Sequence, residues 1–169
     1  MRLLLAFTLC LLVAPASADS AKPALDLVAA ARAQVGVTLI YDPSYQRIAY
    51  PMGDVPPERG VCSDVVIRAF RAVGVDLQQE VHRDMKQHFA TYPKNWGLSA
   101  PDPNIDHRRV PNLATWFTRH GYALPVTQNA GDYQPADVVA WVLDNGRPHI
   151  GIVSDRLSAD GTRRLGIHK

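Results

Sequence analysis

The end of the chain constrains the fold most, because two strand-like runs there are joined by a turn signal. DVVAWVLD (137–144) is rich in β-branched and aromatic residues and is apolar on both alternating faces, which is typical of a central strand. Asp144-Asn145-Gly146 is a turn signal, and HIGIVSD (149–155) is predicted as the returning strand of a hairpin. RRLGIH (163–168) is suited to a third antiparallel strand. An antiparallel meander of this kind needs other elements to cover one face.

Helical patterns precede the meander. ALDLVAAARAQVG (24–36) and CSDVVIRAFRAVG (62–74) both repeat apolar residues at helical spacing and end at a glycine. NLATWFTRHG (112–121) follows Pro111, a residue favoured in the first turn of a helix, and VTLIY (37–41) is predicted as a short extended segment. Helices followed by an antiparallel meander predict a single α+β domain.

The start of the chain has the three parts of a secretory signal peptide. MRLLLAFTLCLLVAPASADS has a positive charge at Arg2, an apolar run over 3–13, and the small-residue cleavage site Ala16-Ser17-Ala18. We therefore expect residues 1–18 to be removed and the protein to be secreted or periplasmic. The apolar run is shorter than the roughly 20 residues that span a bilayer, so no membrane span is expected.

Size and charge limit the remaining possibilities. Residues 19–169 are a usual length for one domain. The whole chain has 18 basic and 16 acidic residues, and the signal peptide carries away one of the basic residues. A balance so close to neutral does not favour nucleic acid or a membrane surface as a partner.

One cysteine, Cys62, remains once the signal peptide takes Cys10 away. It cannot form an internal disulfide, and an odd thiol in an exported protein indicates intermolecular pairing or reactive chemistry. Cys62 begins the predicted helix 62–74, where free N–H groups and the helix dipole favour the thiolate. The alternative is that Cys62 is a small buried hydrophobic residue.

A cysteine nucleophile needs a base and a third group that orients the base. Among the six histidines, His149 is the best placed, because it begins a strand that can lie beside the cysteine helix. Gly151, two residues on, leaves room for close backbone approach. His168 on the next strand can reach the far nitrogen of His149. The alternative for both histidines is a surface position at a strand end.

Four further residues are candidates for substrate binding. The segment NIDHRRV (104–110) is predicted as a charged loop, in which His107 lines a cleft and the adjacent guanidinium groups of Arg108 and Arg109 suit a carboxylate ligand. A solvated surface loop is the alternative. Asp64 is expected to face the N–H groups of the first helical turn as a capping acid, and its functional alternative is to orient substrate.

Longer segments carry a family resemblance. GVCSDVVIRAFRAVGVDL, followed by QPADVVAWVLDNGRPHIGIVSD and RLGIH, resembles the cysteine helix, Pro-x-Asp strand, histidine strand and third-residue strand of the NlpC-type papain-like cysteine peptidases. That superfamily contains cell-wall hydrolases and related amidases. VCSDVVIRAFRAVGVDLQQEVHRDM, YPKNWG and PDPNIDHRRVPNL resemble more closely the YijF-like family, grouped as domain of unknown function 1287. The resemblance covers nearly all of the mature chain.

The resemblance implies a papain-like NlpC-type fold, with N-terminal helices packed on a C-terminal antiparallel sheet. It implies Cys62 as the nucleophile, His149 as the general base and His168 as the residue that orients the base. Two positions depart from the superfamily pattern, because Ala136 replaces a glycine and Val61 replaces an aspartate. Relatives are expected to continue beyond Lys169, so we expect a C-terminally truncated domain over 19–169.

These observations together predict an exported cysteine hydrolase that cleaves an amide bond, with peptidoglycan peptides as the leading substrate. We expect a monomer with no cofactor and no metal, because His82, Asp106 and His107 do not form a recognised zinc spacing. Two alternatives stay open on the same fold, a catalytically silent wall-binding module and an acyltransferase. A metal hydrolase is a weaker alternative.

Overall fold

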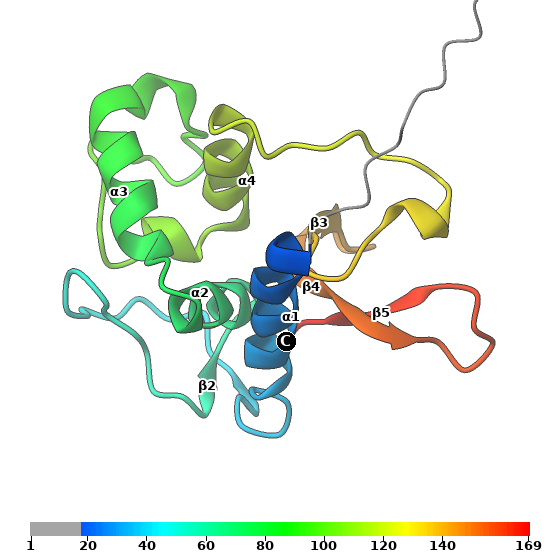
Figure 1. Ribbon diagram of the computed structural model, residues 1–169. Helices are drawn as coiled ribbons and strands as arrows, with labels where there is room; N and C mark the ends of the chain where they lie inside the picture. Colours follow the sequence, from blue (N-terminus) through cyan, green and yellow to red (C-terminus); the bar gives the residue numbers. More distant parts are fainter. Residues whose placement is uncertain (1–17) are drawn as a thin grey trace, which may run out of the picture.

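The computed structural model describes residues 18–169, with side chains from residue 22 onward. The predicted signal peptide lies almost wholly outside the described residues. The helices come first along the chain and a three-stranded antiparallel sheet comes last, which confirms the predicted α+β class (Figure 1). Within the described part, no helix has both the length and the apolar character that crossing a membrane requires.

Residues 18–169 form four α-helices and three short 3-10 turns. They are α1 (Ala18–Arg32), α2 (Cys62–Ala72), α3 (Leu77–His88), α4 (Val110–Arg119), η1 (Phe89–Thr91), η2 (Asp106–Arg108) and η3 (Ala130–Asp132). Helix α3 was not among the predicted helices, although its start carries a clear signal, since the Asp76 side chain accepts a hydrogen bond from the Gln78 N–H. Helix α1 ends before the predicted stop at Gly36, which lies in the turns that follow.

The main sheet has the order β3-β4-β5, with β3 (Val138–Val142), β4 (Pro148–Leu157) and β5 (Arg164–Ile167). Both strand pairs are antiparallel, as predicted. The prediction that 137–144 is the central strand is wrong, because β4 lies between the other two. The two apolar faces of β3 have another cause: Val138 packs against the core, whereas Val139 and Trp141 on the other face line a hollow described below.

A second, smaller sheet precedes the cysteine helix. Strands β1 (Ile40–Tyr41) and β2 (Arg59–Gly60) form a parallel pair. Only the last two residues of the predicted extended segment 37–41 take part. The strand β2 leads directly into α2 and so fixes where that helix begins.

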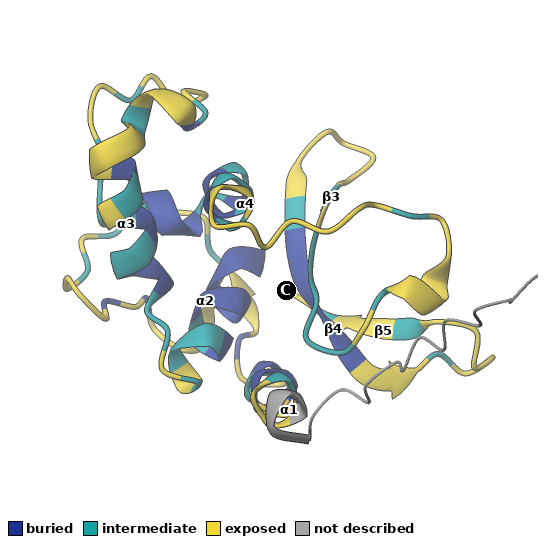
Figure 2. Cartoon of the chain, turned by 45° about the horizontal axis from the view of Figure 1, so that its top comes forward, coloured by how far each residue is buried: buried dark blue, intermediate teal, exposed yellow. Residues whose placement is uncertain are grey.

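The core lies between the helices and the inner face of β4 (Figure 2). On α2, the apolar residues Val65, Val66 and Ala69 are buried, but burial is not confined to one face, because all of residues 62–67 are buried. Ile150 and Ile152 of β4 are each only 1% exposed and pack into the same cluster. Side chains alternate along a strand, so His149 and Gly151 belong to the opposite face of β4.

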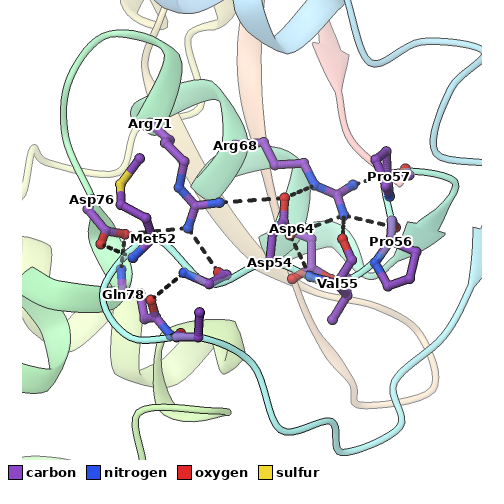
Figure 3. A network of polar contacts seen from close by, with 12 residues as sticks. Met52, Asp54, Val55, Pro56, Pro57, Asp64, Arg68, Arg71, Asp76 and Gln78 are labelled. Carbon is purple, nitrogen blue, oxygen red and sulfur yellow. Dashed lines mark hydrogen bonds and ion pairs between the residues drawn. The ribbon is translucent and has the colours of Figure 1, made fainter.

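A polar network ties the loop before α2 to that helix (Figure 3). Arg68 donates from Nε to the Asp54 carboxylate at 2.9 Å, and Arg71 donates to the Gly53 carbonyl at 3.0 Å. Four further acceptors of Arg68 are the carbonyl oxygens of Val55, Pro56, Pro57 and Arg59. The network fixes the path of the chain into Cys62.

Candidate functional site

Cys62 is the first residue of α2 and follows the N-cap residue Val61. Its side chain is a free thiol, is only 5% exposed and packs in the core cluster together with Ile150 of β4. The helix position is the predicted one. The burial is also what the alternative interpretation of Cys62 as a packing residue requires.

Two opposing effects act on the thiol. Burial raises the pKa of Cys62 above its ordinary value, while the nearby backbone N–H groups of Ile150 and Ser63 favour the thiolate. The carboxylate of Asp64 adds to the rise in the Cys62 pKa. In this state the thiol is protonated at neutral pH, so a nucleophilic role requires a base to take its proton.

The two predicted histidines meet on neighbouring strands. Nε2 of His149 on β4 lies 3.1 Å from Nδ1 of His168, which follows β5 directly. A proton on His149 Nε2 then leaves its Nδ1 with a free lone pair. Burial, and secondarily the charge of His168, lower the pKa of His149, which keeps it neutral and able to act as a base.

Trp141 and Gly151 hold this histidine pair in place. Trp141 pairs with His149 in the β3–β4 register, and its ring centroid lies 4.7 Å from His149 and 5.5 Å from His168. A Cβ at Gly151 would lie 2.9 Å from the Ile167 carbonyl oxygen and 3.0 Å from the His168 Cβ. The absence of a side chain at Gly151 therefore permits the close approach of the Ile167–His168 segment to β4, in line with the room for backbone approach that the sequence predicts.

The structure brings the thiol and the histidines to neighbouring positions without joining them. Cys62 lies beside the backbone of Ile150, and His149 is the preceding residue on β4. Between residues 18 and 169, no hydrogen bond joins the Cys62 thiol to the His149 imidazole. His149 projects from the face of β4 opposite Ile150, and β5 pairs with β4 only from Ile152 onward, so a Cys–His pair requires the His149 ring to move around the unpaired edge of β4.

Asp64 and Arg108 form a buried ion pair. The Arg108 guanidinium donates to both Asp64 carboxylate oxygens, at 2.8 and 2.9 Å, and both side chains are 3% exposed. Asp64 also accepts from the Val61 N–H at 2.7 Å, which confirms its predicted capping role. The pair leaves neither side chain facing solvent, so their positions do not support the predicted contact with substrate.

The segment 104–110 is not the exposed charged loop that its composition predicts. His107 is 2% exposed, and burial, aided by the Arg108 charge, lowers its pKa to about 3. His107 therefore lies in the core and not along a cleft. Arg109 points elsewhere than Arg108, because it binds Asp106 at 3.2 Å and lies over the Trp96 ring at 4.2 Å. Only Arg109 of the four predicted substrate-binding residues keeps a partly exposed side chain.

A hollow of about 620 Å³ lies on the face of the sheet away from the helices. Its wall includes Trp141, Tyr133, Gly151 and His168, with Arg163 and Arg164 also lining it. Neither Cys62 nor His149 lines it. The hollow therefore adjoins the histidine pair and not the thiol.

Two features of the site were not foreseen from the sequence. Trp141 lies as far before Asn145 in the turn as His149 lies after it, so counting the hairpin register would have paired them. The Asp64–Arg108 pair spans 44 residues and has no local signal.

Among the described side chains, no group of three or more His, Cys, Asp or Glu residues is placed to hold a metal ion.

Comparison with known proteins places the chain in a family. A family described as "Domain of unknown function (DUF1287)" matches residues 28–169. The chain belongs to this family. It is 61% identical over 132 residues to "Uncharacterized protein YijF" of Escherichia coli (strain K12), an alignment that covers 78% of this chain and 64% of that protein. The chain thus spans less than two thirds of the length of the curated relative it matches. No solved structure matches the chain.

Proposed function

We propose that the protein is an exported cysteine hydrolase that cleaves an amide bond, on a papain-like fold of the NlpC type. The observation that carries the proposal is the His149–His168 contact next to the Cys62 segment of the core. This contact occupies Nε2 of His149 and leaves Nδ1 free. His149 also directly precedes Ile150, whose backbone lies beside the thiol. Cys62, His149 and His168 supply a nucleophile, a base and an orienting group, which are the parts of a thiol acyl-transfer site.

The reaction follows from these three roles. His149 Nδ1 takes the Cys62 proton as the sulfur attacks the carbonyl carbon, and the C–S bond forms a tetrahedral oxyanion. Backbone N–H groups at the start of α2 are suited to stabilise that oxyanion. The C–N bond then breaks, and the amine leaves with the proton from His149. Water, deprotonated by His149, attacks the acyl-enzyme and releases the acid and the free thiol.

The substrate we favour is a peptidoglycan peptide. The support is the predicted signal peptide, which directs the protein to the compartment where such peptides occur, and the resemblance to cell-wall hydrolases. No metal or cofactor has a role in these steps. Transfer of the acyl group to an amine in place of water is the acyltransferase variant of the same chemistry.

One observation favours a rival proposal, a wall-binding module without catalysis. The thiol is buried, its pKa is raised, and no hydrogen bond joins it to His149 within the described residues. A module of this kind would bind wall fragments and leave them intact.

The test is to incubate the full chain with peptidoglycan fragments and to follow the products by mass. The proposed hydrolase adds one water to a cleaved amide, and Cys62→Ala should stop the cleavage. The acyltransferase gives amine adducts when an amine acceptor is added. Fragments that bind but stay intact would favour the module and overturn the hydrolase.

A further inference from the structure

The start of α2 is fixed to η2 by the two buried side chains that follow Cys62. The Ser63 hydroxyl donates to the Arg108 carbonyl oxygen at 2.6 Å, and the Arg108 guanidinium binds Asp64 through both carboxylate oxygens. Ser63 is 0% exposed and Asp64 is 2% exposed. One residue, Arg108, therefore contacts both residues that follow Cys62, once through its backbone and once through its side chain.

Asp64 has a structural reason to be at this position. Its Oδ2 accepts from the Val61 N–H and caps the helix, and a Cβ at Gly60 would come within 2.8 Å of that oxygen. A carboxylate in the first turn stabilises a helix. The same negative charge, close to a buried thiol, opposes formation of the thiolate.

Arg108 is placed to reduce this conflict. Its planar guanidinium matches the carboxylate in a two-bond contact, and its remaining N–H groups donate to the Asp42 and Ser44 carbonyl oxygens. The charged and titratable groups near the thiol are thus Asp64 on its own helix, Arg108 from η2 and His149 from β4. The buried residues that α1 contributes to the core cluster with Cys62 are apolar: Leu27, Val28 and Ala31.

We propose that Arg108 is a positioning residue for Cys62, which holds the first turn of α2 and offsets part of the Asp64 charge beside the thiol. It lets a carboxylate cap the helix with a weaker negative charge at the nucleophile. Its importance for catalysis rests on the proposed function. The effect on the thiol itself does not, since it can be measured without a substrate.

The test is the rate of iodoacetamide alkylation of the full chain against pH. The mass of the peptide that contains Cys62 separates its reaction from that of Cys10. Arg108→Met leaves the Asp64 charge without its partner. The midpoint of the plot of alkylation rate against pH should therefore move to higher pH by about one unit, so that Cys62 reacts about tenfold more slowly at a pH below the midpoint. Asp64→Asn leaves the Arg108 charge instead, so its midpoint should move to lower pH.

Opposite shifts separate this role from mere support of the fold. The double variant Asp64→Asn/Arg108→Met should return the midpoint close to that of the parent, whereas general disruption would shift every variant the same way. Arg109→Met is the matched control, because this neighbouring arginine binds Asp106, and its midpoint should stay in place. Circular dichroism verifies that each variant is folded.

Each outcome decides the proposal. An unmoved midpoint in folded Arg108→Met, or a double variant that behaves like Arg108→Met, overturns it. If Arg108→Met does not fold, Arg108→Gln takes its place, because it removes the positive charge but keeps an N–H donor for Asp64, and an unmoved midpoint overturns the proposal. Absence of hydrolysis by the parent chain would count against the proposed function and leave the alkylation result standing.

Discussion

The thiol side of the candidate site is buried and ion-paired, whereas the histidine side is partly exposed and held by ring contacts. Cys62 sits in the core, and the next two residues are tied to Arg108. His149 and His168 lie near the surface of the sheet and share one hydrogen bond and the Trp141 ring. The nucleophile is therefore fixed, and the base is the part that is free to turn.

This difference indicates which half of the site adjusts when substrate binds. A core side chain such as Cys62 cannot move without disturbing its neighbours, because interiors are close-packed. His149 is partly exposed and lies where β4 has no β5 partner, so its ring can move around the strand edge without disturbing the core. We expect substrate binding to bring the His149 ring toward the thiol, and the following predictions test the two sides in turn.

Removal of the thiol should have the largest effect. Cys62→Ser should lower the rate of wall-fragment hydrolysis by roughly 10³-fold or more, because a hydroxyl beside histidine is far harder to ionise than a thiol. The melting temperature should change little. Hydrolysis assays and thermal unfolding of the same variant check both parts. A folded Cys62→Ala protein that hydrolyses at the parent rate would remove the thiol from the mechanism.

Removal of the base should come next. His149→Ala should lower turnover by roughly 10²-fold or more, the usual contribution of a general base, and leave folding nearly unchanged. His88→Ala is the matched control, since His88 is exposed on α3 and contacts Asp84. Steady-state kinetics on both variants give the comparison. Equal activity in the two would show that the sheet side takes no part in catalysis.

The buried side should also make the fold sensitive to acid through His107. Its pKa is about 3 in the folded protein and near 6.5 when unfolded, so below pH 6.5 the unfolded state takes up a proton that the folded state refuses. The free energy of unfolding should therefore fall as pH drops, by about 3 kcal/mol from His107 at pH 4. His107→Gln should lose correspondingly less over that range. Urea unfolding at several pH values measures this, and parallel curves for the two proteins would contradict it.

The smallest effect concerns the packing of the histidine side. Gly151→Ala should lower the free energy of unfolding by about 1–3 kcal/mol, because its Cβ meets the Ile167 carbonyl and the His168 Cβ. It should also slow turnover by displacing His168. Gly166→Ala is the control, since the nearest atom to its Cβ is 3.7 Å away, an ordinary contact. Similar losses in the two variants would show that close approach at Gly151 is unimportant.

Local patterns predict much of the fold around both sides of the site. The helical period predicts α2, although not that its first turns are buried on all sides, and the turn between β3 and β4 places His149 at the start of the returning strand. Both signals lie within one element or one hairpin. The strand order follows the chain, so the predicted meander itself places β4 in the centre, and the apolar composition of 137–144 is what wrongly indicates a central strand there.

Partners far apart in the sequence explain the other errors. The composition of segment 104–110 suggests a solvated loop, and only the fold reveals that Asp64 neutralises Arg108 within the core.

Helix α3 is mostly polar, and its fully buried apolar residues, Leu77, Val81 and Met85, form a narrow stripe. The period of that stripe is helical, but it is too sparse to stand out among charged neighbours.

The Arg68 network has a consequence for proteolysis. The loop at 54–59 is largely exposed and rich in proline, the kind of segment that proteases usually cut. A protease needs several residues to detach and extend into its active site. Here the carbonyl oxygens of Val55, Pro56, Pro57 and Arg59 all lie within hydrogen-bond distance of one guanidinium, so detachment must break those contacts together. The loop should therefore survive digestion in the intact protein, and Arg68 protects the approach to the nucleophile from cleavage.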